Sequence, residues 1–168
     1  MKMLIVLILI SCTCQAQKID PPPVKPTAQW RMNNNKWITG GLVFIAGSAK
    51  GFNETLVFHY KVFRKKFPNA NHQWYDPKLS WRNKYKNRDP NQSSKFAMST
   101  SAFIFTTDQY HLNNFIGRSA LLTAIVIKIG EKKKPFKYYM YDLLYYTACF
   151  QAGFALTYYP FASWTQNK

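Results

Sequence analysis

Acidic residues are scarce in this sequence of 168 residues: seven Asp and Glu stand against twenty-three Lys and Arg, which gives a formal charge of +16. This scarcity excludes an extended acidic surface for cationic partners. A chain with so large a positive charge attracts phosphate-rich partners instead, either nucleic acid or the headgroups of anionic lipids.

Cysteine and catalytic motifs are also scarce. The three Cys and three His show neither the spacing of a disulfide framework nor that of a zinc finger, and the sequence lacks a His-x-x-x-His pair. It also lacks a Gly-rich phosphate loop, a Gly-x-Ser-x-Gly elbow, a zinc-deaminase pattern and an internal repeat. Cys149 lies in an apolar run with no His nearby in sequence, which favours a small core residue over a nucleophile. The sequence therefore supports no metal site and identifies no cofactor.

Positive charge is present in two clusters, and their position indicates the partner. Residues 61–95 hold ten basic residues against only Asp76 and Asp89, and a second cluster follows at residues 132–137. Both clusters flank apolar stretches, and aromatic residues make up 17% of the chain, as expected for side chains at a membrane interface. We expect anionic lipid headgroups as partners, with a membrane protein or a second copy of the chain as a further partner, and we do not expect nucleic acid.

The first sixteen residues have the parts of a secretory signal. Lys2 precedes an apolar run at residues 4–10, and small and polar residues follow, so cleavage after Ala16 is one prediction. The alternative is a lipoprotein signal, because residues 9–12 resemble a lipobox that would make Cys12 the lipidated first residue. Both readings predict export to a membrane of the bacterial cell envelope.

Apolar runs divide the remaining chain into a linker and one domain. Residues 17–36 contain the Pro-rich segment 20–26 and are predicted to be an extended linker, and residues 37–168 are predicted to form a single helical membrane-associated domain. Its fold class is all-α: a small membrane-embedded bundle with helices at about 37–60, 108–130 and 137–159, the last one stopped by Pro160. Residues 61–98 form a long basic aromatic loop, expected to fold with short helices, and residues 99–105 an interfacial or re-entrant piece.

Two membrane arrangements fit this pattern. Three passes from an external start place the basic loop inside, as the positive-inside rule prefers, but leave residues 132–134 outside. A monotopic arrangement, with the helices buried in one leaflet, avoids that conflict.

Charged side chains within the apolar helices form a predicted polar cluster. Lys50 and Glu54 lie four residues apart on one helix face, next to Asn53, which fits either a structural ion pair or a polar pocket between helices. Asp142 lies near the start of the last helix, where a carboxylate gains from the helix dipole. If the helices pack together, Glu54, Asp142 and the pair Asp108 and His111 would converge.

The start of the second helix carries the sharpest candidate for chemistry. Asp108, His111 and Arg118 fall on one stripe, and a carboxylate three residues from a His orients the imidazole as a general base requires. The alternative is a structural role, in which Asp108 caps the helix, His111 lies at the interface and Arg118 snorkels.

Three features carry a family resemblance. Asp108-x-x-His111 at a helix start, Lys50-x-x-x-Glu54 in a helix and Asp142 followed by Gly153 in the last helix resemble the small VanZ-like and YfiM-like membrane or lipoprotein families. The chain as a whole, including residues 80–85, is similar to uncharacterised exported proteins of Bacteroidetes-type bacteria. The resemblance implies a small membrane protein or lipoprotein and implies no activity.

Two functions follow as hypotheses. The first is an envelope membrane protein with a structural or interaction role at an anionic membrane surface. The second is a membrane-embedded hydrolase or transferase that acts on a lipid or phospho-ester, with His111 as base, Asp108 orienting it and Arg118 or Lys50 on the phosphate.

Overall fold

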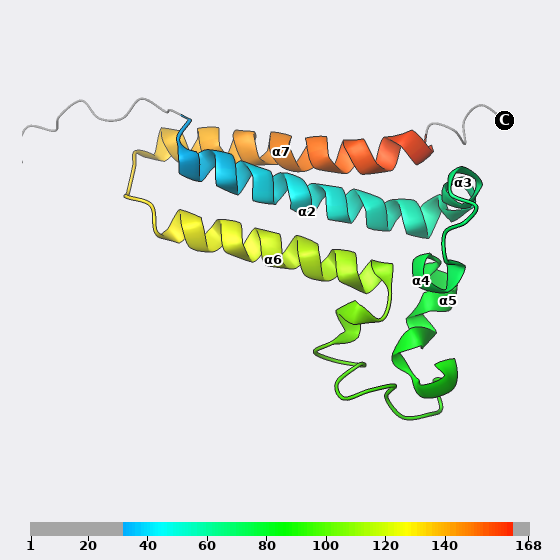
Figure 1. Cartoon of the computed structure of the whole chain (residues 1–168). Helices are drawn as coiled ribbons and strands as arrows, with labels where there is room; N and C mark the ends of the chain where they lie inside the picture. Colours follow the sequence, from blue (N-terminus) through cyan, green and yellow to red (C-terminus); the bar gives the residue numbers. More distant parts are fainter. Residues whose placement is uncertain (1–31, 163–168) are drawn as a thin grey trace, which may run out of the picture.

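Three long helices make up most of the molecule. The computed structural model describes residues 32–162, with α2 (Asn34–Phe58), α6 (Gln109–Ile129) and α7 (Phe136–Ala162) as the long helices. Figure 1 shows α2 between the other two, and α2 packs along both of them while α6 and α7 scarcely touch each other. No strand occurs within residues 32–162, so the all-α prediction is confirmed for this part of the chain.

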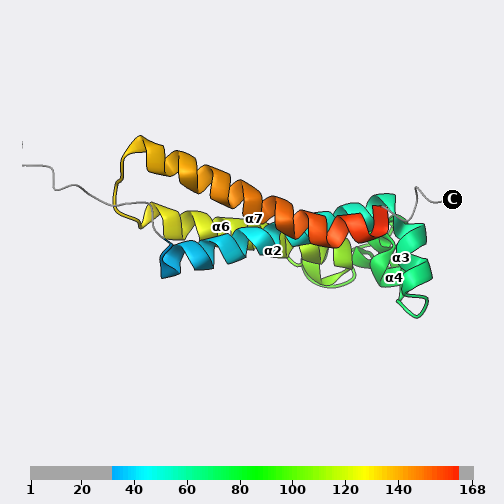
Figure 2. The ribbon, with the colours of Figure 1, turned by 90° about the horizontal axis from the view of Figure 1, so that it is seen from above.

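The helices run up, down and up. Thr39 of α2 contacts Tyr146 of α7, and further along both helices Thr55 contacts Thr157, so these two helices are parallel. Asn53, late in α2, contacts Tyr110, early in α6, so α6 is antiparallel to α2. Seen from above in Figure 2, the long axes follow nearly one direction and the molecule is elongated.

Helix boundaries follow local capping chemistry. The Asn33 side chain accepts a hydrogen bond from Lys36 N, so α2 begins at Asn34, three residues before the predicted start at residue 37. The Asp108 side chain accepts from His111 N at 2.9 Å, which confirms the predicted cap of α6. The predicted stop at Pro160 is wrong: α7 continues to Ala162, because the fixed φ of proline fits a helix although its missing N–H does not. The predicted signal segment, Cys12 and most of the linker lie outside the described residues.

The basic segment between α2 and α6 is folded, as predicted. It contains α3 (Tyr60–Lys66), α4 (His72–Tyr75) and α5 (Pro77–Ser80), and then three short 3₁₀ helices: η1 (Trp81–Lys84), η2 (Lys86–Arg88) and η3 (Ile104–Thr106). Figure 1 places this segment at one end of the three long helices. A small apolar core joins it to them, made of Leu56, Val62, Phe63 and Phe161.

Glycines bring α2 and α7 into backbone contact. A Cβ added at Gly47 would overlap the Phe150 carbonyl oxygen, one at Gly51 would overlap Phe154 and Thr157, and one at Gly153 would overlap the Phe44 carbonyl oxygen. The Gly47-x-x-x-Gly51 spacing therefore lies on the side of α2 that faces α7. Small residues at such a contact let backbone and short polar groups meet directly, as in membrane helix pairs.

Candidate functional site

The space between the long helices is lined by small and polar side chains. Thr39 and Thr55 are fully buried against α7, where Thr39 Oγ1 and Tyr146 OH lie 2.7 Å apart and Thr55 Oγ1 donates to the Thr157 carbonyl oxygen at 2.9 Å. The α2–α6 contact is made by alanines and glycine: Ala46, Ala49, Gly117, Ala120 and Ala124.

Large apolar side chains lie on the outside instead. Among the most exposed are Trp37, Ile38, Leu122, Val126, Ile129, Phe136, Leu143, Leu144 and Leu156. The described residues contain one helix, Gln109–Ile129, that is both long and apolar enough to cross a membrane, and only 17% of its apolar window is buried. Along most of the three long helices the usual order of a soluble domain is thus reversed, with polar or small residues buried and large apolar side chains exposed.

Five charged side chains meet where α6 ends and α2 and α7 begin. Asp142 Oδ2 accepts from Lys128 Nζ at 2.9 Å and from Lys134, and Asp142 Oδ1 lies 3.8 Å from Lys36 Nζ. Glu131 accepts from Lys128 and, at 3.2 Å, from Lys134. The side chains of Lys36 and Asp142 are only 8% and 5% exposed. Three ammonium groups around two carboxylates give this lysine–carboxylate cluster one net positive charge.

Glu131 lies between α6 and α7 and is held in its charged form. Burial alone would raise the pKa of its carboxyl, but hydrogen bonds from the Lys128 and Lys134 ammonium groups outweigh burial and lower the pKa below its usual value. Its second oxygen, Oε1, is buried without a hydrogen-bond partner among the described residues. The lysines therefore stabilise a carboxylate that is only partly solvated.

An amide cluster holds α2 against α6 near the other end. The Asn53 amide donates to the Tyr110 carbonyl oxygen at 3.2 Å and to Asn114 Oδ1 at 3.1 Å, and it accepts from Asn113 at 2.9 Å. Gln109 donates to Asn113 Oδ1 and accepts from Trp74 Nε1 at 3.0 Å. Neutral hydrogen bonds thus connect the basic segment to both long helices.

Asp108 and His111 lie together, as their spacing predicts. His111 Nδ1 is 2.7 Å from Asp108 Oδ2, and Asp108 is 1% exposed. The other Asp108 oxygen caps α6 and Thr107 donates to Oδ2 at 3.2 Å, so the carboxylate fixes both the helix start and the imidazole. Arg118 is exposed and lies seven positions, about 10 Å, further along α6. Its role on a phosphate beside this pair stays a prediction.

The predicted convergence of the polar residues is wrong. Lys50 and Glu54 pair with each other at the surface, where the Lys50 side chain is 57% exposed. Asp142 lies at the level of Lys36, which is 17 positions, about 25 Å, before Asn53 on α2. Among residues 32–162 no group of three or more His, Cys, Asp or Glu side chains comes close enough to hold a metal ion.

Sequence reasoning missed Lys36, Lys128, Glu131 and Lys134 as partners of Asp142. Lys36 was assigned to the linker, and the lysines at residues 132–134 were read as one surface cluster. A usable signal was the alternation of Lys128, Glu131 and Lys134 at spacings of three, which places both lysines beside one carboxylate.

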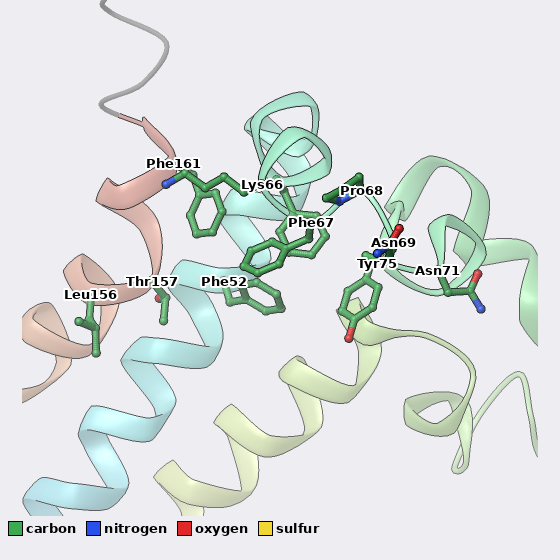
Figure 3. Close-up of a pocket in the computed structure, with 12 residues that line it drawn as sticks. Phe52, Lys66, Phe67, Pro68, Asn69, Asn71, Tyr75, Leu156, Thr157 and Phe161 are labelled. Carbon is green, nitrogen blue, oxygen red and sulfur yellow. The ribbon is translucent and has the colours of Figure 1, made fainter.

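A large aromatic cavity lies near the amide cluster, where the end of α7 meets α3. Its volume is about 830 Å³, and five of its twelve lining residues are aromatic: Phe52, Phe63, Phe67, Tyr75 and Phe161. Lys66 is also among the lining residues. Figure 3 shows the Lys66 side chain extending across the ring of Phe161. Nothing in the sequence pattern predicted this cavity, because its walls come from segments about 100 residues apart.

Comparison with known proteins adds no family. A scan of protein-family models, a search of curated proteins and a search of solved structures each gave no match.

Proposed function

We propose that this chain is an integral membrane protein of the bacterial cell envelope, with a structural or interaction role at an anionic membrane surface. The observation that carries this proposal is the reversed polarity of the three long helices: apart from Leu56 and Phe161 their buried residues are polar or small, and many large apolar side chains are exposed on them. Exposure of such apolar faces to water would cost free energy, whereas acyl chains solvate them in lipid. Contacts between small residues can then hold the helices together.

Helix lengths support the same proposal. α2, α6 and α7 have 25, 21 and 27 residues, about 37, 31 and 40 Å at 1.5 Å per residue, against about 30 Å for a bilayer core. Among the described helices α6 is the one that is also apolar enough to cross. Buried Lys36 and Asp142 face each other rather than the outside, which is the arrangement that makes charge tolerable within or beside lipid.

The basic segment supports anionic headgroups as the partner. Its cations are mostly exposed, including Lys61, Arg64, Lys65 and Lys78, and aromatic rings accompany them. Exposed Lys and Arg near an anionic leaflet each add about 1 kcal/mol of attraction. Vesicle flotation tests this: binding should be stronger to phosphatidylglycerol than to phosphatidylcholine vesicles and should weaken with salt.

Alkaline carbonate extraction of membranes tests the insertion itself. The full chain should stay in the membrane pellet, because its outer face is solvated by acyl chains rather than held by charge. The paired change Leu122→Lys and Val126→Lys, on the exposed face of α6, should reduce recovery in the pellet. Recovery of the unaltered chain in the soluble fraction would end the proposal.

Labelling at introduced cysteines separates three passes from a monotopic arrangement. Up-down-up helices that span place Ser94 and Lys133 on opposite sides, whereas helices lying in one leaflet expose both on one side. Ser94→Cys and Lys133→Cys, each made in a chain with Cys14→Ser and Cys149→Ser, should react with an impermeant maleimide on opposite faces of sealed vesicles. Equal reaction on one face would support the monotopic alternative.

The second candidate function is a hydrolase or transferase acting on a lipid or phospho-ester. It is favoured by one observation, the 2.7 Å contact that orients His111 through Asp108. It predicts that His111→Gln abolishes turnover of a phospho-ester lipid while leaving helix content unchanged. Unchanged turnover, or unchanged phenotype in cells, would leave Asp108 and His111 with their capping role alone.

A further inference from the structure

The aromatic cavity has the size and wall of a site for one apolar chain. Its volume of about 830 Å³ falls within the range of about 300 to 1,000 Å³ typical of small-molecule sites. Phe52, Phe63, Phe67 and Phe161 line it, as Figure 3 shows for the three labelled rings. Phe63 also packs against Phe67 and Phe161, with ring centroids 5.1 and 6.1 Å apart, which fixes this part of the wall.

The cavity is open on the side of the outer face of α7. Leu156 belongs to its lining and is 64% exposed, so the wall continues into the apolar outer surface of the helix. An apolar chain can therefore enter sideways along α7, without passing the polar contacts between the long helices.

Charge at the cavity has one sign. Lys66 is the one cation among the lining residues, and none of them is Asp or Glu. Its Nζ lies 4.8 Å from the centre of the Phe161 ring and donates to the Pro160 carbonyl oxygen at 2.7 Å, which holds the ammonium at the end of α7. Arg64 and Lys65 precede it in α3 and add to the positive potential.

We propose that this cavity binds the anion of a long-chain fatty acid, with the acyl chain among the phenylalanines and the carboxylate beside Lys66. One cation in the lining matches one negative charge, whereas a phosphate monoester would call for more. The Asn69 and Asn71 amides, also among the lining residues, supply neutral polar groups on the other side of the cavity from the Lys66 ammonium in Figure 3. The inference goes beyond the proposed function and stands on the cavity itself, whether or not the long helices cross a membrane.

The experiment measures where and how tightly palmitate binds to the full chain in phosphatidylcholine nanodiscs. Palmitate carrying a photoreactive diazirine in mid-chain should label peptides that contain Phe63, Phe67 and residues 156–161. Unlabelled palmitate should compete for this labelling, and hexadecanol, which has the same chain without the charge, should compete about five-fold less well. Each methylene removed from the competing acid should weaken it by about four-fold.

Two pairs of variants locate the effect. Ala70→Trp places an indole in the cavity lining and should weaken competition by palmitate at least ten-fold, while Leu122→Trp, on the exposed face of α6, should leave it unchanged. Lys66→Gln removes the cation and should abolish the preference for palmitate over hexadecanol. Lys61→Gln removes an α3 cation outside this cavity and should keep that preference.

Each other outcome overturns the proposal. Labelling spread over the outer faces of α6 and α7, unaffected by Ala70→Trp, would mean a general lipid shell. Occupation of the cavity by a second copy, or by residues after Phe161, would show as no labelling of the cavity peptides at any concentration of the photoreactive palmitate. If carbonate extraction shows that the chain does not insert, the same labelling is done on the full chain in buffer without nanodiscs, so the two proposals fail separately.

Discussion

The two ends of α2 are held by different chemistry. At its start Lys36 faces Asp142 in a buried cluster of charges, and near its end Asn53 binds Asn113 and Asn114 through neutral amides. Both ends join α2 to a neighbouring helix through side chains that a soluble core would replace by leucine or valine. The two ends differ in what the loss of a partner does: a buried charge without a partner lowers the free energy of unfolding far more than a buried amide without one.

This comparison suggests a division of roles. The lysine–carboxylate cluster joins α2, the end of α6 and the start of α7, so it fixes the relative height of three helices at one end. The amide cluster joins α2 to α6 and, through Gln109 and Trp74, to the basic segment. We therefore expect loss of the lysine–carboxylate cluster to lower the free energy of unfolding more than loss of the amide cluster does.

Removing the central carboxylate should have the largest effect. Asp142→Asn leaves Lys36, Lys128 and Lys134 with Glu131 as their remaining carboxylate and should lower the free energy of unfolding by about 3 kcal/mol. Unfolding by SDS, followed by circular dichroism in mild detergent, measures it. Glu54→Gln breaks the exposed pair with Lys50 and, as a matched control, should cost less than about 1 kcal/mol. Equal losses in the two variants would remove the distinction between the buried and the exposed charges.

Close packing of α2 and α7 predicts the next largest effect. Gly153→Val should lower the free energy of unfolding by about 2 kcal/mol, because its branched side chain would overlap the Phe44 carbonyl oxygen and force the helices apart. Gly41 has open space around it, so Gly41→Ala should be neutral or stabilise α2 by up to about 1 kcal/mol. The same unfolding assay measures both. A neutral Gly153→Val would show that the two backbones are not in contact.

The long helices were predictable because their signals are local. Apolar run length, the Asp108 cap and the Gly47-x-x-x-Gly51 spacing each depend on neighbouring residues. The charge cluster was not predictable, because Lys36 meets Asp142 only once the parallel register of α2 and α7 is known. A pattern also gave the wrong end to α7, since the fixed φ of Pro160 fits a helix and α7 continues for two residues beyond it. The aromatic cavity was not predictable either, because its walls come from segments that are far apart in the sequence and meet only through packing.

Breaking the amide cluster should have a smaller effect than either change above. Asn53→Ala leaves the Asn113 and Asn114 amides without this partner and should lower the free energy of unfolding by about 1 to 2 kcal/mol. Adding Asn113→Ala should cost little more, because the two amides act through one shared contact. Strictly additive losses would mean that Asn53 and Asn113 are held independently.

Acid should weaken the charged end before the amide end, and this is the smallest effect expected near neutral pH. The Glu131 carboxyl has a lowered pKa in the folded protein, so it adds stability above the usual pKa of a glutamate, and that stability is lost as pH falls through the lowered value. Between pH 7 and 5 the carboxylate stays charged in both states and its contribution should be constant. Unfolding free energies of the unaltered chain should therefore fall only below about pH 4.5, the ordinary glutamate value, and the fall should be smaller in Glu131→Gln. The titration separates the two ends because the side chains of Asn53, Asn113 and Asn114 do not gain or lose a proton in this pH range. If the unaltered chain and Glu131→Gln lost the same free energy of unfolding in acid, the loss would belong to other carboxylates.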